Sequence, residues 1–287
     1  MNKQQTTIGL VAPAGAIKKE SIQAAIDICL ANGFNIVEGK HLYSRDRHYS
    51  GTIQQRADDI NTFLEDDSID IIYAARGGSG SPMILKHINW SLWQKTAKPL
   101  IGFSDITALQ LALYKKTGIS SLSGMGMTTH FKSNIYQKLN FDILGKTSIT
   151  QDDFKKSDIK IEKEGKITGT LIGGCLTMIT TLIGTEYFPN DEDIILVLED
   201  VNEPIYAIER NLFHLKQIGF LDKVKGLILG KFTYKEEELD IWNECGYLFE
   251  NLEVAVSNFP YGHIENCITV PTGISATLST TPFNLEW

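Results

Sequence analysis

Short apolar segments of strand length alternate with helical patterns over the first 113 residues, and this alternation restricts the fold more than any other feature. The sequence predicts strands at 7–11, 34–37, 69–75 and 100–103. Segments with helical periodicity lie between them, including 18–32 and a helix that opens at Thr52. Strands separated by helices in this way form a mostly parallel sheet with helices on both faces.

Two turns of this predicted sheet carry residues suited to chemistry. Arg76-Gly77-Gly78-Ser79-Gly80 follows the third strand, and Ser104 follows the fourth. Ligands of parallel sheets bind beyond the carboxyl ends of the strands. We therefore expect the glycine-rich turn and Ser104 to face one site.

Ser104 has two interpretations. A serine is a favoured N-cap, and a helical pattern follows it directly through Ala108 and Leu113. A serine between a strand and a helix can also expose its hydroxyl beside inward-pointing backbone N–H groups, as a nucleophile that attacks a carbonyl must. The segment departs from G-x-S-x-G because Ile106 replaces the final glycine.

The glycine-rich turn has three interpretations. Its backbone N–H groups could cradle a phosphate or stabilise an oxyanion beside Ser104, or the turn could simply connect a strand to a helix. Its spacing fits neither G-x-G-x-x-G nor G-x-x-x-x-G-K-[ST].

The second half of the chain has a different pattern. Residues 151–166 are highly charged, and beyond them strands are predicted at 166–172, at 194–198 and through Leu227 and Leu229. Helices are predicted at 205–218 and near 237–251. We expect an N-terminal parallel-sheet α/β domain at 1–140, a linker at 141–165, and a β-rich, barrel-like α+β domain at 166–287.

Two further side chains complete a possible catalytic set. Glu199 follows the apolar run 194–198, where a carboxylate could orient an imidazole or simply be solvated. His263 lies in the turn-rich segment Pro260-Tyr261-Gly262-His263, where it could be a general base or an exposed polar residue.

Composition and residue spacing exclude several classes of function. The 287 residues carry a net charge of −8, which argues against general nucleic-acid binding. The four cysteines are far apart, and the histidines lack metal-ligand spacing, so we expect no metal and no cofactor. No apolar run is long enough for a leader segment or a membrane span, and a cytoplasmic protein with no membrane partner is expected.

Several motifs in order resemble the LD-carboxypeptidase family, serine peptidases that include muramoyltetrapeptide carboxypeptidases and microcin C self-immunity hydrolases. The resemblance covers nearly the whole chain. The motifs are V-A-P-x-G at Val11–Gly15, A-R-G-G-x-G at Ala75–Gly80, K-P-L-I-G-x-S-D-I-T-A-L at Lys98–Leu109, L-E-D-V at Leu198–Val201, G-H-x-x-N at Gly262–Asn266 and P-x-G at Pro271–Gly273.

The resemblance implies roles for individual residues. Ser104 would be the nucleophile, His263 the general base and acid, and Glu199 the residue that orients His263. The backbone N–H groups of Gly78 and Asp105 would form the oxyanion hole.

The resemblance also implies which residues contact the substrate. Arg76, Gly77 and Ser79 would contribute to substrate binding, with Arg76 and the loop amides as candidates for the terminal carboxylate. Ser79 departs from the family, whose loop often carries tyrosine there, which leaves the substrate open.

The implied activity is removal of a terminal D-amino acid, D-Ala, from an L-centred diamino acid in murein tetrapeptide during cell-wall recycling. The partner would be a small peptide or muropeptide, and the family suggests a homodimer. One alternative is an immunity-type hydrolase that cleaves a carboxamide between an aminoacyl or peptidyl group and a nucleotide. Another is a noncatalytic protein that binds an anion at the glycine-rich turn.

Overall fold

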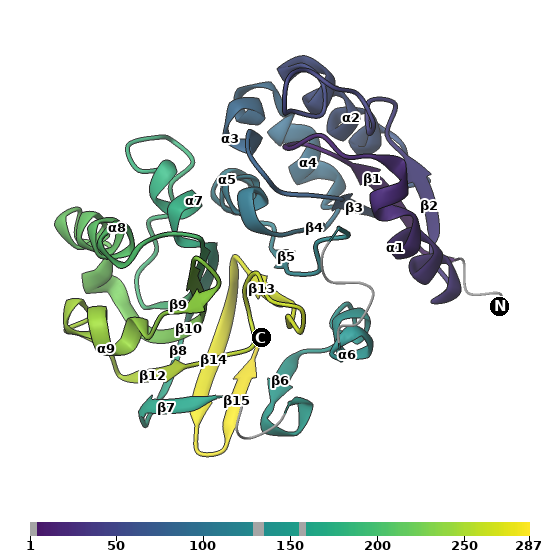
Figure 1. Ribbon diagram of the computed structural model, residues 1–287. Helices are drawn as coiled ribbons and strands as arrows, with labels where there is room; N and C mark the ends of the chain where they lie inside the picture. The colour runs from purple at the N-terminus through teal and green to yellow at the C-terminus, as the bar shows by residue number, and fades with distance from the viewer. Residues whose placement is uncertain (1–4, 129–134, 155–158) are drawn as a thin grey trace.

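Two β-sheets organise the chain, one in each of two adjoining units (Figure 1). The computed structural model describes residues 5–128, 135–154 and 159–287. The first sheet has six strands in the order β13-β5-β4-β3-β1-β2. These strands are β1 (Thr7–Val11), β2 (Asn35–Glu38), β3 (Ile71–Ala74), β4 (Leu100–Gly102), β5 (Ser121–Ser123) and β13 (Val270–Thr272). β1 to β5 pair in parallel, as predicted, and β13 pairs antiparallel with β5.

Helices cover both faces of this sheet, because alternate residues of each strand face opposite ways. Ile8 and Leu10 of β1 pack in a core with the buried face of α1, whereas Val11 packs in a second core with α2 and α5. The helices of this half are α1 (Lys19–Ala31), α2 (Ile53–Glu65), α3 (Ser81–Ile84), η1 (Leu85–His87), α4 (Trp90–Thr96), η2 (Ser104–Ile106), α5 (Thr107–Thr117) and α6 (Gln137–Asp142). The predicted start of α2 is confirmed, since Thr52 and Gln55 form a capping box.

The second sheet is mixed. Its strands follow the order β6-β15-β14-β8-β9-β10-β12-β7, with β11 paired to β10. They are β6 (Ser148–Thr150), β7 (Lys160–Lys163), β8 (Lys166–Cys175), β9 (Ile194–Val201), β10 (Val224–Tyr234), β11 (Glu237–Glu238), β12 (Val254–Ser257), β14 (Ile274–Thr280) and β15 (Phe283–Glu286). β8, β9, β10 and β12 run parallel. β7 pairs antiparallel with β12 on one side, and β14, β15 and β6 follow β8 on the other side by successive antiparallel pairings.

The second sheet encloses a core of its own. Ile195 of β9, Ile228 of β10, Leu278 of β14 and Leu285 of β15 belong to one buried cluster, and the end strands β6 and β7 of the sheet do not pair with each other. The opposite face packs on the helices of this half, which are α7 (Leu176–Thr181), α8 (Ile205–Gln217), η5 (Leu221–Lys223), α9 (Ile241–Cys245) and η6 (Gly246–Leu248).

One predicted helix is shorter than expected. The segment 237–251 begins with β11, which pairs antiparallel with the end of β10, and helix α9 begins only at Ile241. Asp240 caps α9 by accepting a hydrogen bond from the N–H of Asn243, and Gly246 ends it. The pairing of a hairpin strand therefore overrides the helical pattern of the acidic run.

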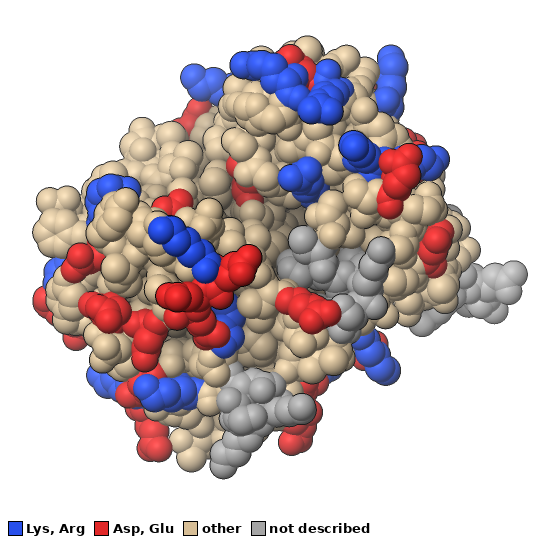
Figure 2. Space-filling model, viewed as in Figure 1, with Lys and Arg blue, Asp and Glu red and all other residues tan. Residues whose placement is uncertain are grey.

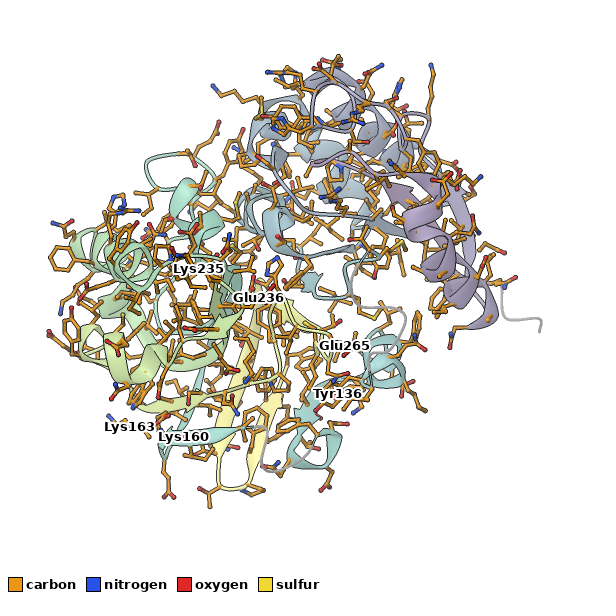
Figure 3. The ribbon with its side chains drawn as sticks, viewed as in Figure 1. Tyr136, Lys160, Lys163, Lys235, Glu236 and Glu265 are labelled. Atoms are coloured by element: carbon orange, nitrogen blue, oxygen red, sulfur yellow. The ribbon has the colours of Figure 1, made fainter. Side chains whose placement is uncertain are left out.

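The segment predicted as a linker, 141–165, contains secondary structure. β6, the 3₁₀ turn η3 (Gln151–Asp153) and β7 lie within it, and residues 155–158 are outside the described residues. β6 pairs with β15 and β7 pairs with β12, so both extend the second sheet. Figure 3 shows Lys160 and Lys163 of β7 at the lower edge of this unit.

The chain crosses between the units in a way that joins them. β13 belongs to the first sheet, although β14, which follows at Ile274, belongs to the second. The loop before β13 is also fixed to α6, because the Asn140 side chain donates to the Cys267 carbonyl and accepts from the N–H of Thr269. Figure 3 shows Tyr136, beside α6, close to Glu265 of this loop.

A third contact connects the units at the start of α5. The hydroxyl of Thr107 accepts a hydrogen bond from the N–H of Cys175 at the end of β8. Gly174 has a φ of +146°, and a Cβ added to it would overlap the side chain of Thr107. Glycine is therefore required where β8 touches the helix that follows Ser104.

None of the helices within the described ranges combines the length and apolarity needed to cross a membrane. All four cysteines lie among the described residues, and they are buried thiols without a disulfide bond.

We expect Gly174→Ala to destabilise the protein by loosening the junction between the units. Gly184→Ala is the matched control, because Gly184 also has a positive φ (+79°), but a Cβ added there would meet nothing within 4 Å. The control measures backbone strain alone, about 1–2 kcal/mol, and Gly174→Ala should cost roughly 1–3 kcal/mol more through overpacking. Urea denaturation measures both, and equal losses would contradict the close contact.

Candidate active site

Ser104 occupies a strained turn between β4 and α5. Its φ is +65°, in the left-handed region that a residue with a Cβ adopts at a cost. No side-chain cap is found for η2 or α5, so the N-cap interpretation is contradicted. The Ser104 Oγ instead lies 2.9 Å from Nε2 of His263, 159 positions away in the sequence. The turn thus presents the hydroxyl to an imidazole that follows β12 of the other unit.

Glu199 holds the other side of the histidine ring. Its Oε2 lies 2.7 Å from Nδ1 of His263, and its side chain is completely buried. When the carboxylate accepts a hydrogen bond from Nδ1–H, Nε2 is left to accept the Ser104 hydroxyl. The three side chains form one continuous line of hydrogen bonds.

The prediction that a strand ends just before Glu199 is wrong in detail. β9 continues through Val201, because β10 extends far enough to pair with Asp200 and Val201. Glu199 therefore lies within β9 rather than in a loop: it pairs with Cys175 of β8, and a register shift in β10 falls opposite it. A carboxylate in a parallel ladder has little freedom to leave the histidine.

His263 sits in the loop between β12 and β13. Gly262 before it has a φ of +144°, and a Cβ there would press against the Lys231 carbonyl at 3.1 Å. The imidazole packs against Phe103, with ring centroids 4.7 Å apart. Tyr261 also contacts Phe103 edge to face and shares a 2.6 Å hydrogen bond with Ser123 of β5. Phe103, the residue before Ser104, thus helps to position the ring of His263.

Burial and charge act in opposite directions on the Glu199–His263 pair. Burial lowers the pKa of His263, but the charge and hydrogen bond of Glu199 outweigh it and raise the pKa above its ordinary value. Burial raises the pKa of Glu199, and His263 opposes that rise. A carboxylate removed from water is a strong partner for a positive charge on the ring.

The glycine-rich turn packs directly against Ser104. A Cβ on Gly77 would lie 2.8 Å from the Ser104 Cβ and 3.1 Å from the Asp105 nitrogen. Gly78 has a φ of +105°. Among the described residues, neither the N–H of Gly78 nor that of Asp105 has a hydrogen-bond acceptor. Two backbone donors therefore remain available near the hydroxyl.

A cavity of about 540 Å³ contains Ser104 and His263 and is lined by residues of both units. Figure 2 shows a recess between the units. The lining residues are Ser21, Arg76, Gly77, Gly78, Phe103, Ser104, Gly126, Thr128, Val201 and His263. Ser79 is exposed and is not among them. A cavity of about 590 Å³ at the opposite end of β4, beside Lys98, contains none of these residues.

The sequence does not identify two of the cavity residues as part of a functional site. Phe103 is predicted only as part of a strand, and Val201 only as the end of the L-E-D-V motif. Arg76, by contrast, is among the predicted site residues, and its Nη1 donates to the Ala16 carbonyl at 2.8 Å, which holds it at the cavity. In the part of the chain that the structure describes, no group of three or more histidine, cysteine or acidic side chains could hold a metal ion.

Two family models match most of the chain. The LD-carboxypeptidase N-terminal domain matches residues 8–124, and the LD-carboxypeptidase C-terminal domain matches residues 168–278. The chain belongs to the LD-carboxypeptidase family. A Rickettsia conorii protein named as a carboxypeptidase is 30% identical over 79% of this chain and 73% of its own length. A murein tetrapeptide carboxypeptidase of Pseudomonas aeruginosa is 28% identical over 94% of this chain and 92% of its own length.

Solved structures agree with this LD-carboxypeptidase assignment. The muramoyltetrapeptide carboxypeptidase of Oxalobacter formigenes superimposes with a TM-score of 0.86, at 26% identity and 98% coverage of both chains. The microcin C7 self immunity protein in complex with aspartyl sulfamoyl adenosine has a TM-score of 0.88, covering 99% of this chain and 96% of the other. At 24% identity, the second likeness shows the shared fold alone.

We expect His263 to titrate above about 6.5, its ordinary pKa, in a histidine-detected NMR titration. In Glu199→Gln the negative charge that raises the pKa of His263 is replaced by a neutral amide. Burial of the ring then dominates, and the pKa of His263 should fall below its ordinary value. Glu253→Gln, at an exposed carboxylate, is the control and should change nothing. An unshifted His263 in Glu199→Gln would contradict the pairing.

Proposed function

We propose that this protein is a serine-type LD-carboxypeptidase that hydrolyses the amide bond between an L-centred diamino acid and a terminal D-amino acid. The proposed substrate is murein tetrapeptide, which would lose its terminal D-Ala in cell-wall recycling. The observation that carries the proposal is the line of hydrogen bonds from Ser104 through His263 to Glu199 at one cavity. The names of the Pseudomonas and Oxalobacter relatives support the choice of substrate.

In the acylation step, the Ser104 Oγ attacks the carbonyl carbon while Nε2 of His263 takes the hydroxyl proton. Glu199 holds the ring and stabilises the imidazolium. The carbonyl oxygen becomes an oxyanion that accepts hydrogen bonds from the N–H groups of Gly78 and Asp105. The imidazolium then gives its proton to the departing D-amino acid nitrogen, and the C–N bond breaks.

Deacylation repeats these steps with water. A water molecule gives one proton to Nε2 of His263 and attacks the acyl carbon. Collapse of the second oxyanion breaks the bond to the Ser104 Oγ, which recovers the proton from the imidazolium. Ser104, His263 and Glu199 return to their starting states, and no metal or cofactor takes part in the proposed steps.

Recognition of the free carboxylate would select an exopeptidase reaction. Arg76 lines the cavity and brings a positive charge to it, and the amide of Gly77 lies on the same turn. We assign these groups, with Ser79 at the turn's exposed end, to the terminal carboxylate and its neighbouring residue.

An immunity-type hydrolase is the second candidate. It would use the same three side chains to cleave a carboxamide between an aminoacyl or peptidyl group and a nucleotide. The fold shared with the microcin C7 self immunity protein supports it, as does Ser79, because a smaller side chain there changes the turn.

We also propose that the protein acts in the cytoplasm as a homodimer. Four cysteines that form no disulfide bond are typical of a reducing compartment. Sedimentation equilibrium would measure the subunit number, and a monomer at micromolar concentration would overturn that part of the proposal.

Ser104→Ala should lower the turnover of murein tetrapeptide by on the order of 10⁴- to 10⁶-fold, since it removes the nucleophile. D-Ala release measures this loss. Ser275→Ala, at an exposed serine of β14, is the control and should retain full activity. A Ser104→Ala protein that still releases D-Ala at the wild-type rate would exclude Ser104 as the nucleophile. Absence of D-Ala release from the wild-type protein itself would instead favour anion binding without chemistry.

The two candidate substrates should be distinguished by direct comparison. We expect D-Ala release from the free tetrapeptide to exceed cleavage of aspartyl sulfamoyl adenosine in kcat/KM. Both reactions should disappear together in Ser104→Ala, because they use one nucleophile. A preference for the nucleotide substrate would replace the first candidate by the second.

A further inference from the structure

We propose that the carboxylate of Asp105 is a positioning group that holds the two proposed oxyanion donors at a fixed separation. The inference rests on the proposed function, in which the N–H groups of Gly78 and Asp105 stabilise the oxyanion. It assigns to the side chain of Asp105 a task separate from that of its backbone.

The contacts of Asp105 join the nucleophile turn to the glycine-rich turn. Its Oδ1 accepts a hydrogen bond from the N–H of Gly80 at 3.1 Å, and its Oδ2 accepts one from the N–H of Ser81 at 2.8 Å. The Ser81 hydroxyl donates back to the Asp105 carbonyl at 2.5 Å. Asp105 is only 3% exposed. Three hydrogen bonds therefore connect the residue after Ser104 to the end of the turn that carries Gly78.

Arg56 holds the same turn from its other side. Its Nη1 donates to the carbonyls of Gly80 at 2.9 Å and Pro13 at 2.7 Å, and its guanidinium lies over the Tyr49 ring. Gly80 is thus held through both its N–H and its carbonyl. Burial raises the pKa of Asp105, while the backbone hydrogen bonds and the charge of Arg56 oppose this rise and favour the ionised form.

Steric contact alone does not set the position of Gly78. Gly77 touches Ser104, and Gly15 donates to the Gly77 carbonyl, but these contacts restrain only the start of the turn. Gly78 and Gly80 both have positive φ values, so the turn between them needs an anchor at its far end. The Asp105 carboxylate and Arg56 supply that anchor. Oxyanion stabilisation depends on such pre-set donor geometry.

Asp105→Asn tests this role, with Asp59→Asn as a matched control. An amide keeps the shape but places an NH₂ donor against one of the two N–H groups that the carboxylate accepts. Asp59 is also buried and accepts a backbone N–H, that of His41, with both oxygens. It does not line the cavity that contains Ser104. The two variants therefore lose similar hydrogen bonds at different places.

We expect Asp105→Asn to lower kcat for tetrapeptide by roughly 10- to 100-fold, less than complete loss of a donor. The KM should change by less than about threefold, because the interaction is made in the transition state. The acid limb of the pH profile should keep its midpoint, since Glu199 and His263 stay paired. Asp59→Asn should lower the unfolding midpoint to a similar extent without lowering kcat.

Three outcomes would decide the matter. If Asp105→Asn and Asp59→Asn lose the same stability and the same kcat, the inference is overturned, and the Asp105 carboxylate has only a structural role. Wild-type kcat in Asp105→Asn would also overturn it, while leaving serine hydrolysis intact if Ser104→Ala is inactive. If Asp105→Asn does not fold, Arg56→Lys provides the test, because it keeps the charge but not the paired donation to Gly80 and Pro13; an unchanged kcat in that variant would count against the anchor.

Discussion

The antiparallel pairing of β13 with β5 is the constraint on which the site depends. Val270 pairs with Ser123 across the boundary between the two units, so the loop that carries His263 must pass over the carboxyl end of the first sheet. Ser104 lies at that same end, after β4, which neighbours β5. Glu199 belongs wholly to the second sheet. His263 therefore connects the hydroxyl of Ser104 with the carboxylate of Glu199, which belong to different sheets.

This arrangement places strain and restraint on the same short segment. Ser104 adopts a left-handed φ without the final glycine of a G-x-S-x-G turn, because Ile106 must fill the buried core beneath it. The segment keeps that conformation since it is held at three points: Phe103 by the rings of Tyr261 and His263, Asp105 by the glycine-rich turn, and Thr107 by β8. Strained backbone persists at a site when its surroundings over-determine it.

The sequence predicts what is local and misses what arises between distant segments. Strand–helix alternation identifies the parallel sheet, and the carboxyl ends of its strands identify both turns. Glu199 and His263 each have an ordinary structural interpretation alone, and only the order of motifs links residues 64 positions apart. The helix expected near 237–251 begins only at Ile241, because β11 pairs with β10. The contacts of Phe103 and the Asp105 carboxylate depend on packing, which no local pattern encodes.

Adjacent carboxylates in β9 show why Glu199 rather than Asp200 contacts the histidine. Successive residues of a strand face opposite ways, so Glu199 faces His263 while Asp200 faces α7. Asp200 accepts hydrogen bonds from the N–H groups of Thr177 and Val201 and from the Thr177 hydroxyl, which satisfy its charge. Glu199 is fully buried, and its Oε1 has no hydrogen-bond partner among the described residues. A carboxylate with so few donors gains most from an imidazolium, which is the species that the proposed reaction must stabilise.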